Sequence, residues 1–247
     1  MMRSYFAMCF APLLGISSGA YAGEIKVLCD GPLRPALTQI TQAFERDSGH
    51  QMKVEFGLSP VIHKKVIDGE PADVIIIQPN FIEELVTAGK LAAGEHPIIA
   101  RVGIGLMVRA GTDAPDVSTA DLLKQALLAA DSIVFSNVAA GNAFAKVLEQ
   151  LGIAETVKDK VTRTTPADVI ARILQSKGRD IGVGTTTLIR ADQRLKLAGP
   201  LPGGLQSYLV YAAASTIAGQ HSEPAKTLIR FLASPAAKTQ FAEAGAY

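Results

Sequence analysis

Short apolar segments alternate with amphipathic segments along most of this chain, and no other feature constrains its fold as strongly. The apolar segments have the length of strands, and residues 72–78 contain a continuous apolar run, as in a strand buried on both faces. The predicted strands are residues 25–29, 52–56, 72–78, 132–136, 180–184 and 208–215. Strands and helices that alternate in this way predict an α/β fold in which helices flank mostly parallel sheets.

The segments between the strands have helical periodicity. Leu33, Leu37, Ile40 and Phe44 share one helical face, and Gly89 is placed to end the helix that precedes it. Further helices are predicted at residues 80–91, 142–152 and 167–175, with a short helix before residues 68–69 and another that opens at Pro224. Residues 111–119 and 198–204 are predicted to be loops.

The first 22 residues have the pattern of a secretory signal peptide. Arg3 precedes an apolar stretch at residues 5–16 that is too short for a membrane-spanning helix, and Ala20 and Ala22 fit the small-x-small cleavage rule. We expect cleavage after Ala22 and export to the periplasm, which leaves 225 residues (247 minus 22). A retained N-terminal membrane anchor is the alternative.

Cysteine and charge exclude several classes of protein. Without the first 22 residues, Cys29 is the remaining cysteine, so no intramolecular disulfide is expected. Removal of Arg3 leaves 23 basic residues (24 minus 1) against 23 acidic ones. This balance disfavours a nucleic-acid or anionic-membrane partner. A chain of this length can form one large domain or two small lobes.

Most signatures of catalysis and metal binding are missing from the sequence. Ser59 follows a strand and precedes a helix, as in a nucleophile elbow, but Val61 occupies the position where an elbow needs glycine. The four histidines have no ligand spacing, so neither a metal site nor a cofactor is predicted. These histidines are His50, His63, His96 and His221.

Five strand-to-helix junctions carry small or hydroxyl-bearing residues. They are residues 29–32, 57–60, 136–142, 164–169 and 182–187. Each one could be an ordinary helix cap or turn. Because ligands of parallel sheets bind at the carboxyl ends of the strands, where helix N-termini present free N–H groups, the five together predict a cleft between two α/β halves.

Four segments, at residues 25–49, 69–91, 138–153 and 225–247, resemble the molybdate-type periplasmic solute-binding proteins of ABC transporters. The Pro-Ala-Asp-Val and FLASPAA motifs within them carry much of the resemblance. The resemblance implies a two-lobed periplasmic binding protein fold of type II with a hinge of two strands. It also implies a monomer that binds a small anion and delivers it to a membrane permease. Lobe 1 is expected at residues 23–102 and 211–247, and lobe 2 at residues 103–210.

Carried over to this chain, the resemblance implies a set of ligand donors. Ser59 matches a serine that donates through its hydroxyl and backbone N–H, and Ala140 and Val169 match backbone donors. Pro32 stands where the family has a second serine, and Thr185 stands where it has a tyrosine. Since Pro32 has neither a hydroxyl nor an N–H, molybdate is a doubtful ligand and another oxyanion or a carboxylate is expected.

Three further residues beside these donors are candidate ligand contacts. Gly31 allows a ligand to approach the backbone, and Asn142 lies beside Ala140. Asp30 is either a carboxylate in the cleft or a cap that accepts N–H groups. His63, one helical turn after Ser59, faces either the cleft or solvent.

Residues 108–136 resemble divergent relatives of the same family, among which is periplasmic aconitate isomerase. The resemblance implies an alternative function, a cofactor-independent isomerase that moves a proton on a tricarboxylate. Asp30 or His63 would be the base, and Ser59, Asn142 and Thr185 would bind the carboxylates. An arginine clamp is not evident in the junctions, although Arg34, Arg163 and Arg172 lie near them in the sequence.

Overall fold

The computed structural model describes residues 23–247, so the predicted signal peptide lies outside the described residues. Within them, the strand order is β2-β1-β3-β9-β4-β7-β5-β6, and β8 pairs with β4 beside this path. The strands are β1 (Glu24–Asp30), β2 (Gln51–Gly57), β3 (Val74–Ile77), β4 (Ile98–Arg109), β5 (Ser132–Ser136), β6 (Val161–Thr164), β7 (Asp180–Thr185), β8 (Leu195–Pro200) and β9 (Tyr208–Ser215).

Helices connect most of these strands, as the alternation predicted. The α-helices are α1 (Arg34–Ser48), α2 (Ser59–Ile67), α3 (Pro79–Thr87), α4 (Ala120–Ala129), α5 (Ala139–Gln150), α6 (Ala154–Val157), α7 (Pro166–Leu174), α8 (Thr186–Ala191), α9 (Glu223–Leu232) and α10 (Pro235–Glu243). Short 3-10 helices are η1 (Gly31–Leu33), η2 (Lys158–Lys160) and η3 (Gly203–Leu205). Gly89 has φ +67 just after α3, which confirms its predicted place at the helix end.

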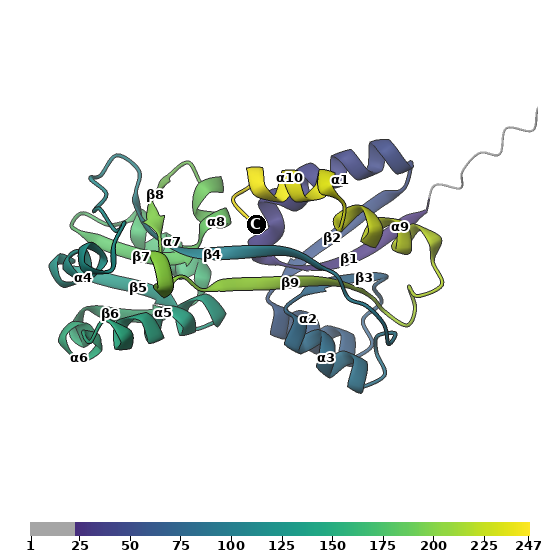
Figure 1. Cartoon of the computed structure of the whole chain (residues 1–247), viewed down its shortest axis with the longest axis horizontal. Coiled ribbons are helices and arrows are strands. Elements are labelled where there is room, and N and C mark those ends of the chain that lie inside the picture. Colours follow the sequence, from purple (N-terminus) through teal and green to yellow (C-terminus); the bar gives the residue numbers. More distant parts are fainter. Residues whose placement is uncertain (1–22) are drawn as a thin grey trace, which may run out of the picture.

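The elements form two groups that are joined by β4 and β9 (Figure 1). Lobe 1 contains β1, β2 and β3 with α1, α2, α3, α9 and α10, and lobe 2 contains β5 to β8 with α4 to α8. β4 and β9 pair antiparallel and carry the chain from one lobe to the other and back. The two-lobed α/β fold with two connecting strands is confirmed. The boundaries at residues 102/103 and 210/211 stay a prediction.

The sheet is parallel within each lobe and antiparallel where the lobes join. β1 pairs parallel with β2 and β3, and β5 pairs parallel with β6 and β7. β4, β8 and β9 make antiparallel pairs. Residues 198–204 are not wholly a loop as predicted, because residues 195–200 form β8. The proline and glycines that suggested a loop are tolerated there because β8 is not on the main strand path.

Alternate residues of the central strands face different hydrophobic clusters. In β1, Val27 and Cys29 face the cluster under α1, α9 and α10, while Leu28 faces the cluster under α2 and α3. In β5, Phe135 belongs to the cluster with α4 and α5, while Val134 packs with α7 and α8. Because side chains point to alternate faces along a strand, apolar residues lie on both faces of each sheet, and helices cover both faces.

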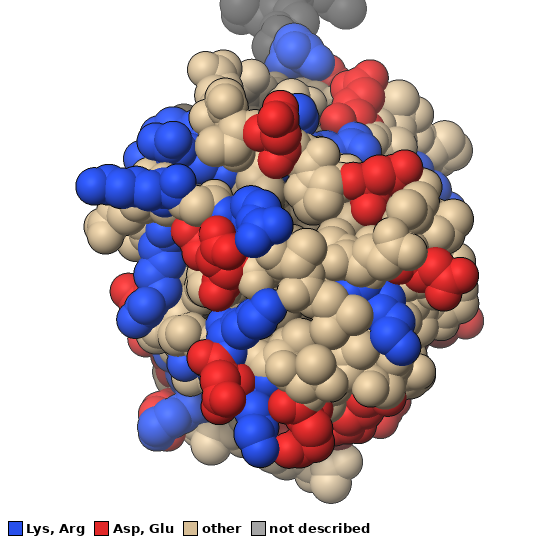
Figure 2. Space-filling model, turned by 90° about the vertical axis from the view of Figure 1, so that its left-hand side faces the viewer, with Lys and Arg blue, Asp and Glu red and all other residues tan. Residues whose placement is uncertain are grey.

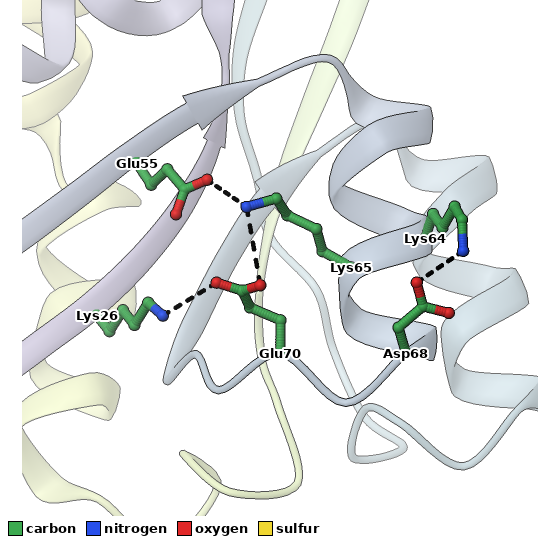
Figure 3. Close-up of polar contacts among 6 residues, drawn as sticks. All are labelled: Lys26, Glu55, Lys64, Lys65, Asp68 and Glu70. Atoms are coloured by element: carbon green, nitrogen blue, oxygen red, sulfur yellow. Dashed lines mark hydrogen bonds and ion pairs between the residues drawn. The ribbon is translucent and has the colours of Figure 1, made fainter.

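Lobe 1 also carries an ion-pair network on its surface (Figure 3). Glu70, in the loop after α2, lies 3.3 Å from Lys26 Nζ in β1 and 3.8 Å from Lys65 Nζ in α2. Lys65 also pairs with Glu55 of β2, and this hydrogen bond lowers the pKa of Glu55. The network links the C-terminal end of α2 to the sheet but contributes little stability, because its members are solvated.

Basic and acidic residues are nearly equal in number, 24 against 23. Basic and acidic side chains are interspersed over the end of lobe 2 (Figure 2), in line with the near-neutral composition. Within residues 23–247, no helix has both the length and the apolar character that a membrane span requires.

Candidate functional site

A cavity of about 560 Å³ lies between the two lobes. Its lining includes residues from all five junctions that the sequence singled out. In lobe 1 these are the ends of β1 and β2, and in lobe 2 the ends of β5, β6 and β7. Because the carboxyl ends of parallel strands meet at one edge of a sheet, each lobe presents its helix N-termini to this cavity.

All seven predicted ligand-binding residues line the cavity, namely Asp30, Gly31, Ser59, Ala140, Asn142, Val169 and Thr185. Their roles in binding stay a prediction. His63 is not part of the lining. Its Nε2 atom lies 3.2 Å from Glu84 Oε2, and its ring packs 5.5 Å from that of Phe81. Asp30 is therefore the candidate base that the structure brings to the cavity.

The Asp30 carboxylate is buried, with 3% of the residue exposed. Its Oδ2 atom accepts a hydrogen bond from the Ser59 backbone N–H at 3.2 Å and another from the Ser59 hydroxyl. The Ser59 oxygen in turn accepts the Gln78 N–H at 3.3 Å. Asp30 thus caps the N-terminus of α2, a helix that begins 29 residues later in the chain.

In this structure Ser59 donates to Asp30, and its role as a donor to a ligand stays a prediction. Both Ser59 donors are engaged by Asp30, and a ligand could use them only by displacing the carboxylate. Burial raises the pKa of Asp30 above its ordinary value, and the hydrogen bonds from Ser59 and Gly31 oppose that rise. The carboxylate is therefore a stronger base than an exposed aspartate, and it lies in the cavity wall.

The two lobes line different sides of the cavity, which we call its poles. Asp30 and Ser59 belong to the pole in lobe 1, and the N-terminus of α5 belongs to the pole in lobe 2. Val138, which precedes α5, has no side chain that can cap, whereas α4, α7, α9 and α10 each begin after a Ser or Thr that does. Within residues 23–247, no acceptor was found for the N–H groups of Ala139, Ala140 and Gly141. Free N–H groups and the helix dipole make this a favourable position for an anion.

Gly141 allows α5 to begin so close to β5. A Cβ atom at this position would lie 1.7 Å from the carbonyl oxygen of Ser136. The helix could not approach the strand end in this way with any other residue. The tight turn brings Ala140 to the cavity wall, with 6% of the residue exposed.

Two other predicted contacts are engaged within the protein. The Val169 N–H donates to the carbonyl of Thr165 at 3.0 Å, so Val169 supplies an apolar wall rather than a free donor. Asn142 Oδ1 accepts a hydrogen bond from Arg163, whose guanidinium also lies 5.4 Å from the ring centre of Phe135. Asn142 is exposed, at the lip of the cavity.

Two buried hydroxyls in the lining have no hydrogen-bond partner among the described residues, Thr185 Oγ1 and Tyr211 Oη. Thr185 ends β7 and is 5% exposed, and Tyr211 lies in β9 and is fully buried. Burial raises the pKa of Tyr211 well above its ordinary value, the charge of Asp30 raises it further, and the neighbouring Gln78 side chain opposes the rise. An unpaired buried hydroxyl is costly unless a ligand or water satisfies it.

Sequence reasoning missed Tyr211 and the junction after β3, where Gln78, Asn80 and Phe81 line the cavity. Signals for both were present. Gln78 and Pro79 follow a buried apolar strand, as the other junction residues do, and Tyr211 is a hydroxyl-bearing residue within an apolar strand.

Arg34 is the one arginine in the lining, and its guanidinium lies 4.2 Å from the ring centre of Phe56. Arg163 and Arg172 are not part of the lining, so the cavity has no arginine clamp. Within residues 23–247, no group of three or more His, Cys, Asp or Glu side chains could hold a metal ion.

The model of the family described as bacterial extracellular solute-binding protein matches residues 25–246. Aconitate isomerase from Pseudomonas sp. is 25% identical over 227 residues, which cover 90% of this chain and 86% of that protein. The molybdate-binding protein ModA of Azotobacter vinelandii is 23% identical over 225 residues, covering 90% of this chain and 89% of that protein.

A solved structure of the periplasmic molybdate-binding protein of Azotobacter vinelandii has the same fold. The TM-score is 0.74 at 19% sequence identity, and the match covers 90% of this chain and 98% of that one. Similarity at this level of identity concerns the fold alone.

Proposed function

The chain belongs to the bacterial extracellular solute-binding proteins, and from this we propose that it binds a small anionic solute between its lobes and delivers it to an ABC-type permease. The proposal includes export to the periplasm after cleavage behind Ala22, and action as a monomer. The expected ligand is an oxyanion or a carboxylate, and the proposal assigns no cofactor.

One observation carries this proposal. The uncapped N-terminus of α5 presents free N–H groups to a cavity between the lobes, beside the unpaired hydroxyl of Thr185. Helix N-termini and hydroxyls stabilise an anion without the need for a basic side chain. The solute would be held mainly by lobe 2 and would close the cleft by reaching lobe 1.

Molybdate and tungstate are not the expected ligands. Pro32 offers no donor, the Ser59 donors are engaged by Asp30, and the Asp30 carboxylate would repel a dianion placed near it. Each donor missing from a charged ligand costs about 1.5–3 kcal/mol.

A thermal-shift screen of the mature protein tests the function. Oxyanions, monocarboxylates, dicarboxylates, tricarboxylates and sugar acids are added separately, and the melting temperature is measured. A binder at a hundredfold excess over its Kd should stabilise the protein by about 2.7 kcal/mol. Tight calorimetric binding of molybdate would contradict the expectation that molybdate is not the ligand. A screen in which no anion raises the melting temperature would contradict the function.

A second candidate function is isomerisation of a tricarboxylate. It is favoured by Asp30, a buried carboxylate of raised pKa in the cavity, and by the relative named aconitate isomerase. Asp30 would take a proton from one carbon of the substrate and return it to another. Incubation with trans-aconitate, followed by chromatography for the cis isomer, tests this candidate. Turnover that survives a chelator and is lost in Asp30→Asn would make the protein an isomerase.

A further inference from the structure

We propose that the solute is a hydroxy acid, whose carboxylate binds at the N-terminus of α5 and whose hydroxyl lies between Asp30 and Tyr211. This inference rests on the proposed function, since it names the class of anion that the cavity takes. It follows from the different chemistry of the two poles of the cavity.

The pole in lobe 2 suits a carboxylate. The N–H groups of Ala139, Ala140 and Gly141 have no acceptor in the described chain, and Thr185 Oγ1 is buried without a partner. The strand register brings these groups together, because β5 and β7 pair side by side and end at the same edge of the sheet. Four donors on one edge can satisfy the two oxygens of a carboxylate.

The pole in lobe 1 suits a group that both donates and accepts. When it is ionised, Asp30 can only accept. Both hydrogen bonds from Ser59 go to Oδ2, so Oδ1 can accept a donor from the ligand. Tyr211 Oη is buried without a hydrogen-bond partner among the described residues, and Tyr211 lines the same cavity as Asp30. A ligand hydroxyl can donate to Asp30 and accept from Tyr211 at the same time.

Other ligand groups fit this pole less well. An ammonium group has no lone pair for the Tyr211 hydroxyl, and a second carboxylate has no proton for Asp30. A simple oxyanion bound at α5 would leave the pole in lobe 1 unsatisfied. The hydroxyl is the group that pairs both protein atoms.

The rest of the lining is largely apolar. Side chains such as Leu58, Phe81, Met107, Ile170, Leu188 and Leu209 line the cavity. A carbon body between carboxylate and hydroxyl would bury apolar surface against them. A hydroxy acid with an apolar side chain should therefore bind more tightly than a smaller one.

Matched pairs of acids test the inference by calorimetry on the mature protein. The pairs are lactate with propionate, malate with succinate, and 3-phenyllactate with 3-phenylpropionate, and both enantiomers of each hydroxy acid are measured. In at least one pair, the hydroxylated member should bind at least about tenfold more tightly, because a site built to pair a hydroxyl rejects the analogue that lacks it.

Tyr211→Phe removes the buried hydroxyl and nothing else. It should weaken binding of the preferred hydroxy acid at least about tenfold and change the affinity for its deoxy analogue less than about threefold. Tyr208→Phe is the matched control, since Tyr208 lies in the same strand but is 48% exposed and outside the cavity lining. The control should leave both affinities unchanged.

The outcomes separate this inference from the proposed function. If propionate, succinate, 3-phenylpropionate or an inorganic oxyanion binds and no hydroxylated partner gains tenfold, the inference is wrong and the anion-binding function stands. An amino acid that binds more tightly than the hydroxy acid of the same skeleton would also overturn it. If no anion binds, the inference and the proposed function both fail.

Discussion

Asp30 determines the chemistry of the cavity at the scale of single residues. It is a carboxylate with 3% exposure in a cleft that is proposed to hold an anion, and it accepts hydrogen bonds from the backbone N–H and the hydroxyl of Ser59. This arrangement makes one pole of the cleft an acceptor while the other remains a donor. A cleft with one accepting side and one donating side favours a solute that carries both an anionic group and a hydrogen-bond donor over a simple ion.

The pKa of Asp30 leads to a prediction about stability and pH. Folding raises this pKa above its ordinary value of 3.8, so the folded protein binds the proton more tightly than the unfolded chain does. The contribution of Asp30 to the free energy of unfolding is therefore present in acid and is lost as the pH rises from about 3.8 through the folded pKa.

Asp30→Asn should remove this pH dependence. The melting temperature of the wild type minus that of the variant, measured between pH 4 and 7, should fall as the pH rises. Other groups titrate in both proteins and cancel from the difference. A difference that rises with pH would mean that the folded protein favours the charged carboxylate.

Ser59→Ala tests the other half of this contact. The substitution removes a donor to Asp30 and an acceptor for the Gln78 N–H, and it leaves buried partners unpaired. The free energy of unfolding should fall by about 1–3 kcal/mol in urea denaturation. Ser118→Ala, at an exposed position, should change it by less than about 0.5 kcal/mol. Equal effects of the two variants would contradict a structural role for Ser59.

At the scale of elements, the turn from β5 into α5 is the feature that opens the cavity to an anion. The turn requires glycine at position 141, because the helix begins almost in contact with the carbonyl of Ser136. The helix also lacks the side-chain cap that several other helices have. Its first N–H groups are therefore left for another acceptor.

Gly141→Ala should displace the start of α5. The free energy of unfolding should fall by about 1–3 kcal/mol, because the added methyl group overlaps backbone atoms that cannot move independently. Binding of whichever anion the screen identifies should also be lost. Gly204→Ala is the control, because a Cβ atom there meets nothing within 4 Å. If Gly141→Ala left both stability and binding intact, the proposal that the N-terminus of α5 binds the anion would be wrong.

At the scale of the whole molecule, the lobes are held together by more than the two crossing strands. Thr187 Oγ1 in lobe 2 donates to the carbonyl of Pro32 in lobe 1 at 2.7 Å, and Thr186 Oγ1 donates to the carbonyl of Gly245 at 3.2 Å. Both hydrogen bonds are buried. The first connects α8 to the segment that carries Asp30 and Gly31, and the second connects α8 to the residues that follow α10.

We expect the ligand-free protein to unfold in one cooperative transition. The lobes share β4 and β9 and are linked by buried hydrogen bonds, so the loss of one lobe exposes the other. Differential scanning calorimetry should give equal calorimetric and van't Hoff enthalpies. Thr187→Val should lower the melting temperature, since it leaves the Pro32 carbonyl unpaired. Two resolved transitions in the wild type would show that the lobes are independent.

The amino-acid sequence by itself determined the α/β class, most helices and strands, and the junctions that line the cavity. Hydrophobic period and helix-capping residues are local signals, and β1, β5 and α7 lie where these signals placed them. The polar lining could be predicted because the carboxyl ends of parallel strands always gather at one edge of a sheet. Within these junctions, the family resemblance singled out Ala140 and Thr185.

The tertiary structure decided which of those groups remain free. Asp30 and Ser59 are 29 residues apart, and their pairing depends on the parallel register of β1 and β2, which places Asp30 opposite Gly57. Tyr211 reaches the cavity because β9 pairs antiparallel with β3, beside β1. No local pattern encodes strand order or register between distant segments. The sequence therefore indicated where a ligand would bind, whereas the register of distant strands decided which donors and acceptors are left to hold it.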